Sequence, residues 1–433
     1  MNIVIVGNGI AGATVARLAR QRDRAARIFL ISDEHPYAFS RTALMYAWMD
    51  RLPRRRLELW ERESWDTLRI ERIHDRVTDV DASARVVQLR RGGAVRFDRL
   101  VLALGAGPRW PEWRGLAQAR AGVTTLVSWQ DLERCEALTA GARAAVVVGG
   151  GLIGIEMVEC LRHHRVPTTF VVREPRYFPA ALDPLESSVV LEAAARHGVR
   201  VLTDDRVAEV QADAGGHVRG VVTERGQRLA ADLLGVAIGV EPAVSQMAAW
   251  ATAPAIGRGV LTTRGHATSL GGVWAIGDCA ERGDGDTLPE QGVVDTSWYA
   301  ARRAAHELVA AWHGEAPGAD PVWFNSARFF ELDYLTVGDA PGRHTGAAPA
   351  SISLRVPGRD VVLRITHEQG TVRGFTAIGS RWDHEVLARW VEGRAPLDDV
   401  RGALDAAAFN GELTTIRGDR FVEVATGGAH EHG

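Results

Sequence analysis

The sequence predicts an α/β protein with two three-layer domains, each built on a parallel sheet, followed by a smaller α+β domain. Three observations support this prediction. The chain has 433 residues, which is enough for two or three domains of ordinary size. A pattern of apolar strand, glycine-rich loop and helix occurs twice, and the C-terminal part of the chain changes to short alternating strands.

The first repeat begins at the N-terminus. Ile3–Val6 is a continuous β-branched run, Ala13–Arg22 has a helical pattern, and Ile28–Ile31 is a second apolar run. Strands without polar alternation that are joined through a helix indicate a parallel sheet buried on both faces. The intervening loop reads Gly-x-Gly-x-x-Gly, whose glycines make a tight turn and admit a pyrophosphate at the helix N-terminus. The predicted ligand-binding residues of this loop are Gly7, Gly9, Ile10, Ala11 and Gly12.

An acidic residue is expected about 20 residues after such a loop, where it binds the ribose hydroxyls of a dinucleotide. Asp33 and Glu34 stand at this position. The strand, the loop, the helix and the acid together predict a Rossmann-like dinucleotide site.

The second repeat has the same order. Ala145–Val148 is predicted as a strand, the following helix runs from Ile155 to about His164, and Thr169–Val172 is the next strand. Two such units indicate two Rossmann-like nucleotide-binding domains. The predicted ligand-binding residues of the second loop are Gly149, Gly151, Leu152, Ile153 and Gly154.

The second repeat shows no acid at its strand end. The strand instead runs into Arg173, with Arg176 nearby. An arginine at this place suits the 2′-phosphate of NADP, which a carboxylate would repel. The pattern therefore favours NADPH, with NADH as the alternative.

The C-terminal region is different. From about Val322 the pattern turns to short strands, including Val361–Ile365 and Thr371–Ala377, and it closes with an amphipathic segment around Glu385–Val391. This pattern predicts a small α+β domain.

Composition excludes several classes of protein. The net charge of -3 gives no reason to expect nucleic-acid binding. Cys135, Cys160 and Cys279 are widely separated, with no CxxC pair and no spacing typical of metal ligands, which fits a reducing cytosol. The apolar stretch from Ala144 to Ile155 is too short to span a bilayer, and the N-terminus reads as a strand rather than a signal peptide. We therefore expect a cytoplasmic protein without a metal site.

Further motifs support a resemblance to a known family. They are Phe97–Gly105, Gly239–Pro242 and Val273–Asp278. With the two glycine loops, their order resembles the pyridine nucleotide-disulphide oxidoreductase superfamily of flavoproteins. The chain most resembles the branch of ferredoxin, rubredoxin and putidaredoxin reductases and the relatives of apoptosis-inducing factor.

The resemblance implies an FAD domain over 1–113 and 241–320 and an NAD(P)H domain over 114–240. It also implies a C-terminal α+β interface domain over 321–433, which forms dimers in some branches, so both a monomer and a homodimer remain possible.

The resemblance also implies roles for single residues. Asp278 would bind the ribityl chain of FAD, the amide of Trp298 would face the flavin, and Arg41 would lie against an FAD phosphate. Further cofactor contacts are expected at Val77, Gly105, Gly239 and Gly277.

The chain departs from this family at two places. No cysteine pair stands where disulphide reductases carry one, so electrons should leave directly from the flavin. The family's loop lysine falls on Tyr46, while the glutamate that pairs with this lysine is retained as Glu156. We expect Glu156 to be protonated, hydrogen-bonded to Tyr46, or paired with an arginine, and these two residues are the catalytic candidates.

The expected reaction passes hydride from NAD(P)H to FAD and then electrons to an acceptor. The acceptor is a ferredoxin-like carrier, a small organic molecule or oxygen, and a redox-sensing protein is a third possibility. Arg51–Arg56 is either a docking surface for an acidic ferredoxin or a solvated face. Trp323–Ser326, with Phe329 and Phe330, either walls the flavin or packs the C-terminal core.

Overall fold

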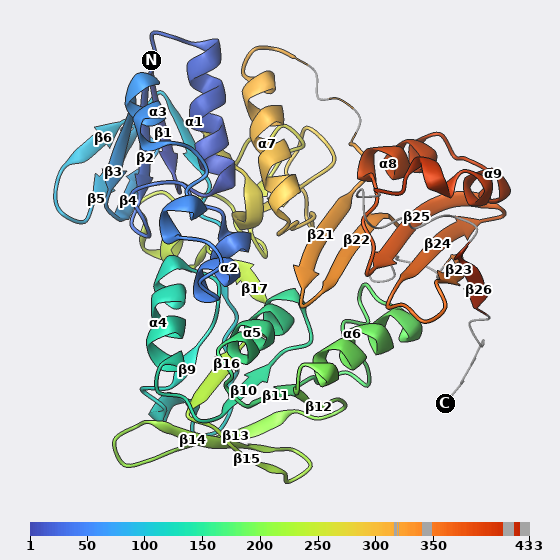
Figure 1. Cartoon of the computed structure of the whole chain (residues 1–433). Coiled ribbons are helices and arrows are strands. Elements are labelled where there is room, and N and C mark those ends of the chain that lie inside the picture. The colour runs from blue at the N-terminus through green and yellow to red at the C-terminus, as the bar shows by residue number, and fades with distance from the viewer. Residues whose placement is uncertain (316–317, 319, 340–348, 410–419, 425–433) are drawn as a thin grey trace. The chain divides into compact units, whose positions relative to one another are not determined.

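The computed structural model describes residues 1–433 except 316–317, 319, 340–348, 410–419 and 425–433 (Figure 1). The chain divides into two compact units. The first comprises Met1–Pro111, Thr124–Ala140 and Ile238–Ala319, and the second comprises Glu112–Val123, Gly141–Ala237 and Asp320–Gly433. No helix within the described ranges is long and apolar enough to cross a membrane.

The first unit is built on a five-stranded parallel sheet with the order β19-β7-β1-β2-β3. The predicted first repeat is confirmed, because its strand, helix and second strand are β1, α1 and β2. The strands are β1 (Asn2–Val6), β2 (Arg27–Ser32), β3 (Ile70–His74), β7 (Arg99–Leu102) and β19 (Val273–Ala275). The helices are α1 (Ile10–Arg22), α2 (Leu44–Trp48), α3 (Arg62–Thr67), α4 (Trp129–Thr139) and α7 (Trp298–Ala311).

Alternate residues of β1 face two separate cores, which makes the first unit three-layered. Ile3 and Ile5 pack with α1 and α7 on one face of the sheet. Val4 and Val6 pack on the other face against the antiparallel sheet β4-β5-β6 and the segment around Trp250. The smaller strands of this unit are β4 (Val77–Asp81), β5 (Val86–Leu89), β6 (Ala94–Arg96), β8 (Ala106–Pro108), β17 (Val240–Pro242), β18 (Val260–Thr262) and β20 (Ala280–Arg282).

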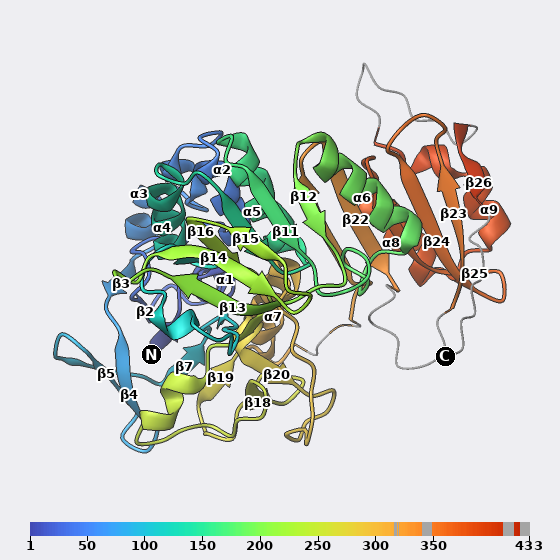
Figure 2. The same ribbon diagram turned by 90° about the horizontal axis from the view of Figure 1, so that it is seen from below.

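The second unit repeats this plan with the sheet order β12-β11-β10-β16-β9. The second predicted repeat is confirmed as β10, α5 and β11. An antiparallel sheet, β13-β14-β15, follows the same pattern as β4-β5-β6 (Figure 2). The elements are β9 (Val123–Thr124), β10 (Ala145–Val148), α5 (Leu152–His163), β11 (Thr168–Val171), α6 (Pro184–Arg196), β12 (Arg200–Leu202), β13 (Val207–Ala212), β14 (Val218–Thr223), β15 (Arg228–Ala230) and β16 (Leu233–Val236).

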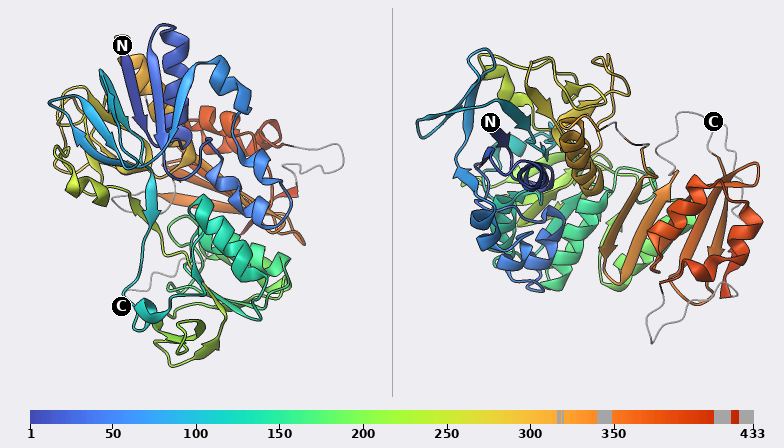
Figure 3. Two further views of the ribbon diagram at one scale, coloured as in Figure 1. Left: turned by 90° about the vertical axis from the view of Figure 1, so that its left-hand side faces the viewer. Right: turned by 90° about the horizontal axis from the view of Figure 1, so that it is seen from above.

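The C-terminal region of the second unit is a six-stranded antiparallel sheet with the order β21-β22-β25-β24-β23-β26. Helix α8 packs on one face of this sheet together with α9, as predicted for a small α+β region (Figure 3). The elements are β21 (Phe324–Phe329), β22 (Leu332–Gly338), β23 (Ala350–Arg355), β24 (Val362–Glu368), β25 (Thr371–Ile378), α8 (His384–Glu392), α9 (Leu397–Gly402) and β26 (Val422–Val424).

A buried ion pair joins this sheet to the nucleotide domain of the same unit. Arg364 on β24 donates to both carboxylate oxygens of Glu186 on α6, at 3.0 and 3.1 Å, and to the backbone oxygen of Ala181 at 2.9 Å. Glu186 is 0% exposed and Arg364 is 4% exposed. Burial raises the pKa of Glu186 to about 7, and the guanidinium of Arg364 works against this rise. Asp183, the N-cap of α6, accepts a further hydrogen bond from Ser353.

A second contact fixes the β21–β22 hairpin. Phe330 in its turn has a φ of 51°, a left-handed conformation that is costly for a bulky side chain. Its amide donates to the buried carboxylate of Glu159 on α5 at 2.7 Å, and its ring stacks on His197 at 4.5 Å. The nucleotide domain and the C-terminal sheet therefore pack as one body, while the predicted boundaries between these domains stay a prediction.

We expect Arg364→Leu to lower the free energy of unfolding by about 3–5 kcal/mol, because it leaves Glu186 buried without its cation. The measurement is the urea unfolding midpoint. Arg373→Leu on the neighbouring strand β25 is the control, since that side chain is 38% exposed and its carboxylate partners lie 3.7 and 3.8 Å away. Equal shifts for the two variants would contradict a special role for the buried pair.

Candidate cofactor-binding site

The first glycine loop forms a cradle of backbone. Gly7 has a φ of 103°, and a Cβ placed on it would lie 2.0 Å from the backbone oxygen of Ala103. A Cβ on Gly12 would lie 2.0 Å from the oxygen of Gly7, so the loop and helix α1 can approach only without side chains. A Cβ on Gly9 would meet nothing within 4 Å. The loop therefore has no room for side chains where it meets Ala103 and α1, whereas Gly9 faces open space. Ile10, Ala11 and Gly12 begin α1 beside this space, and a helix N-terminus there fits a pyrophosphate.

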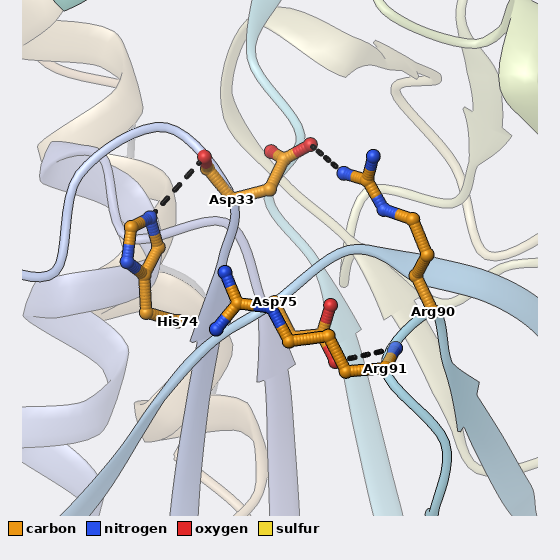
Figure 4. Close-up of a pocket in the computed structure, with 5 residues that line it drawn as sticks. All are labelled: Asp33, His74, Asp75, Arg90 and Arg91. Atoms are coloured by element: carbon orange, nitrogen blue, oxygen red, sulfur yellow. Dashed lines mark hydrogen bonds and ion pairs between the residues drawn. The ribbon is translucent and has the colours of Figure 1, made fainter.

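The two acids after β2 have different surroundings. Glu34 accepts two hydrogen bonds from Arg41, at 2.9 and 2.7 Å, and one from the amide of Trp129 at 2.9 Å. Asp33 instead lines a cavity of about 240 Å³ at the carboxyl ends of β2 and β3 (Figure 4). The geometry thus separates two residues that the sequence left equivalent, and it leaves Asp33 as the acid available to a ribose.

Arg41 lies among three carboxylates of the first unit. Burial opposes its charge, but Glu34, with Asp278 and Asp131 nearby, outweighs this effect and raises the pKa of the guanidinium. Burial raises the pKa of Asp278 to about 6, and Arg41 works in the opposite direction. Three residues that were predicted separately, Glu34, Arg41 and Asp278, are therefore close enough to interact.

The segment Gly277–Cys279 lies between the N-terminal turns of two helices. Gly277 has a φ of 71°, and a Cβ on it would lie 3.2 Å from that of Ala11 on α1 and 3.6 Å from that of Ala301 on α7. Trp298 is the first residue of α7, and Ser297 caps this helix by accepting from the amide of Ala300. The structure thus brings the first loop, the Gly277–Asp278 motif and the α7 N-terminus together, which suits an anionic flavin ligand.

The remaining predicted FAD contacts lie at the ends of strands in the same unit. Val77 begins β4 and is buried. Gly105 has a φ of 71° and Gly239 a φ of 117°, and both stand beside the paired strands β8 and β17. Their contacts with FAD stay predictions.

The second loop has the same close approach. Gly149 has a φ of 129°, and a Cβ on Gly154 would lie 2.0 Å from its oxygen. Leu152 and Ile153 form the first turn of α5, directly after Gly151. This loop is thus a second dinucleotide cradle, in the second unit.

As expected, no acid stands directly at the end of β11, but the structure brings an acid from further along the chain close to the second loop. A carboxylate oxygen of Glu174 lies 3.5 Å from the position of a Cβ on Gly150. The sequence pattern did not assign Glu174 to the second loop, because the chain continues beyond β11 through Val172 and Arg173 before the side chain of Glu174 reaches the loop. The available signal was the number of residues between Gly154 and Glu174, which matches the spacing expected of a ribose-binding acid. Arg173 donates to Glu174 at 2.6 and 3.0 Å, and Arg176 is exposed.

Glu156 lies one turn from a second carboxylate on α5. Burial and, to a smaller extent, the charge of the nearby Glu159 together raise the pKa of Glu156 to about 8. This fits the expectation of a protonated Glu156. Tyr46 lies on α2 of the first unit, so its predicted hydrogen bond to Glu156 stays a prediction.

The cysteines have no redox geometry. Cys135, Cys160 and Cys279 are all buried, and no disulphide joins any two of them. Burial raises the pKa of Cys279 to about 11, and its thiol donates to the backbone oxygen of Leu102 at 3.5 Å. A thiol relay next to the Gly277–Asp278 motif is therefore absent.

Two features that sequence left open are now clearer. In the Arg51–Arg56 cluster, Arg54 pairs with Glu133 and Glu136, and Arg55 pairs with Glu58. These ion pairs neutralise much of the positive charge of the cluster.

Phe329 and Phe330 are buried against Tyr177 and His197, so these two aromatic side chains belong to the packed interior of the second unit.

Comparisons with known proteins identify the family of this chain. The model of the family "Pyridine nucleotide-disulphide oxidoreductase" matches residues 1–305. The chain is 33% identical over 401 residues to the biphenyl dioxygenase system ferredoxin–NAD(+) reductase component of Paraburkholderia xenovorans (strain LB400), covering 90% of this chain and 92% of that relative. It is 31% identical over 282 residues to rhodocoxin reductase of Rhodococcus erythropolis, covering 65% of each chain.

A solved structure shows the same fold. The reductase in the crystal structure of the covalent putidaredoxin reductase–putidaredoxin complex superposes with a TM-score of 0.81 at 22% identity, covering 91% of this chain and 94% of that chain. The chain therefore belongs to the pyridine nucleotide-disulphide oxidoreductase family, in its ferredoxin reductase-like branch without redox cysteines, and is an FAD-dependent NAD(P)H oxidoreductase.

Proposed function

We propose that this protein transfers electrons from NADH through FAD to a ferredoxin-like iron–sulphur carrier of an oxygenase system. The observation that carries this proposal is the relative named as a ferredoxin–NAD(+) reductase component of biphenyl dioxygenase, which matches the chain over nearly the full length of both proteins. The burial of all three cysteines supports direct electron transfer, since a disulphide substrate would need a reactive thiol beside the flavin.

The protein's own residues supply binding and electrostatics for this chemistry. FAD contributes the redox chemistry when it is bound. The proposed roles are pyrophosphate binding at Gly7–Gly12, ribose binding at Asp33, and stabilisation of negative charge by the N-terminus of α7. Arg41 and Asp278 are proposed to contact the phosphate and the ribityl chain. The cytoplasm is the proposed location, and cysteines that form no disulphide suit it.

NADH is the proposed donor rather than NADPH, because Glu174 faces the second loop. A carboxylate there accepts hydrogen bonds from both ribose hydroxyls and repels a 2′-phosphate. Arg173, which favoured NADPH in the sequence, is held by Glu174.

The acceptor can be tested directly. The purified yellow protein is reduced anaerobically with NADH, and a [2Fe–2S] ferredoxin, oxygen or a small quinone is then added. We expect the ferredoxin to reoxidise the flavin fastest, because no thiol relay stands between flavin and acceptor. Fast reoxidation by the quinone or oxygen, with none by the ferredoxin, would favour a two-electron reductase or oxidase. Slow reoxidation by every acceptor would favour a redox sensor.

Donor choice is tested with Glu174→Ala. We expect kcat/KM for NADH to fall about tenfold, while that for NADPH is unchanged or rises, since one charge-assisted hydrogen-bond acceptor is lost. Arg173→Ala is the matched control and should leave NADPH use unchanged. If the wild-type protein preferred NADPH and Arg173→Ala lost this preference, NADPH would be the donor and Arg173 would be its binding residue.

Glu156 should make NADH binding depend on pH. Its pKa of about 8 means that α5 gains a negative charge, one turn after the glycine loop, as the pH rises through this value. Because that charge repels the pyrophosphate, we expect KM for NADH to rise about fivefold between pH 7 and pH 9. Glu156→Gln should give a flat profile, and Glu192→Gln, an exposed carboxylate on α6, should keep the wild-type one. A flat wild-type profile would remove this role from Glu156.

A further inference from the structure

We propose that Arg76 and Arg90 are positioning residues for FAD. They hold one carboxylate oxygen of Asp33 so that its other oxygen is presented to the hydroxyls of the adenosine ribose. The proposal rests on the assignment of FAD to the first glycine loop, and it is independent of the electron acceptor.

Asp33 stands beside the glycine loop. It directly follows β2, whose neighbour in the sheet is β1, the strand that leads into the loop. The amide of Gly7 donates to the backbone oxygen of Ile31 at 2.8 Å, which ties the loop to the end of β2. A dinucleotide phosphate in the loop therefore brings its ribose to the side chain that follows β2.

The two arginines contact the same oxygen of Asp33. Nε of Arg76 lies 2.5 Å from Oδ2, and a terminal nitrogen of Arg90 lies 3.9 Å from this atom. Within the described part of the chain, no hydrogen bond is made to Oδ1. The backbone oxygen of Asp33 lies 3.3 Å from Nε2 of His74 (Figure 4). The carboxylate is therefore held on one side and available on the other, and an ionised carboxylate is a strong acceptor for hydroxyls.

A second acid holds the arginines in place. Asp75 is 7% exposed, and its two oxygens accept from the amides of Arg76, at 2.8 Å, and Arg91, at 3.0 Å. The amide of Arg90 also donates to the backbone oxygen of Arg76 at 2.9 Å. Asp75 thus links the turn of the β5–β6 hairpin to the end of β3. Arg76 and Arg90 therefore lie on two backbone segments that are hydrogen-bonded to each other.

The alternative is that these are ordinary surface ion pairs. The side chains of Arg76 and Arg90 are 53% and 59% exposed, and exposed pairs contribute about 0–1 kcal/mol to folding. Their removal should therefore leave the protein folded. A loss of FAD affinity in such variants would then report a role in binding rather than in stability.

The experiment measures the dissociation constant of the apoprotein for FAD and for an FAD analogue that lacks both hydroxyls of the adenosine ribose. We expect Arg76→Ala to weaken FAD binding about tenfold and Arg90→Ala to weaken it less, because the Arg90 contact is longer. With the analogue, both variants should bind as the wild type does. Arg76→Lys should recover part of the affinity.

The control is Arg96→Ala, an exposed arginine of the same hairpin, which should bind FAD as the wild type does. Equal losses for FAD and for the analogue would show a general structural effect and overturn the proposal. So would unchanged FAD affinity in both variants. Neither measurement uses NADH or a ferredoxin, so failure here is distinguishable from failure of the proposed electron transfer.

Discussion

The close approach of two backbone segments is the constraint on which both nucleotide sites depend. In each loop the last glycine of the fingerprint stands where a Cβ would lie 2.0 Å from the oxygen of the first, at Gly12 against Gly7 and at Gly154 against Gly149. Only without side chains can the helix begin directly behind the strand. Its first amides then point at the ligand, and the acid after the next strand comes within reach of the ribose.

The same constraint explains why the fold could be predicted from the sequence. The strands and helices of both repeats follow from apolar runs and glycine spacing, and β24, β25 and α8 follow from alternation and amphipathicity. The antiparallel sheets β4-β5-β6 and β13-β14-β15 were not predicted. Their strands are short and place exposed or half-buried residues between the buried ones, so no long apolar run marks them in the sequence.

The residues of the candidate site could be predicted where a glycine motif determines the backbone conformation. They were harder to predict where a role depends on which side chains come into contact. Residue spacing could not tell Asp33 from Glu34, because the difference lies in the contacts of Glu34 with Arg41 and with Trp129, which comes from a distant part of the chain. It also missed Glu174, because the turn after β11 carries this side chain back to the glycine loop. Both are tertiary effects that a local pattern does not contain.

The buried pair of Arg364 and Glu186 has a consequence for how this protein can be recombined with its relatives. The C-terminal sheet is anchored by side chains whose partners lie on α6, so it is not a portable module. A chimera that received this sheet from another reductase would leave a fully buried carboxylate without its cation unless the new strand carried an arginine at the position of Arg364. Residues of α6 and of the C-terminal sheet therefore have to be exchanged together, although they lie far apart in the sequence.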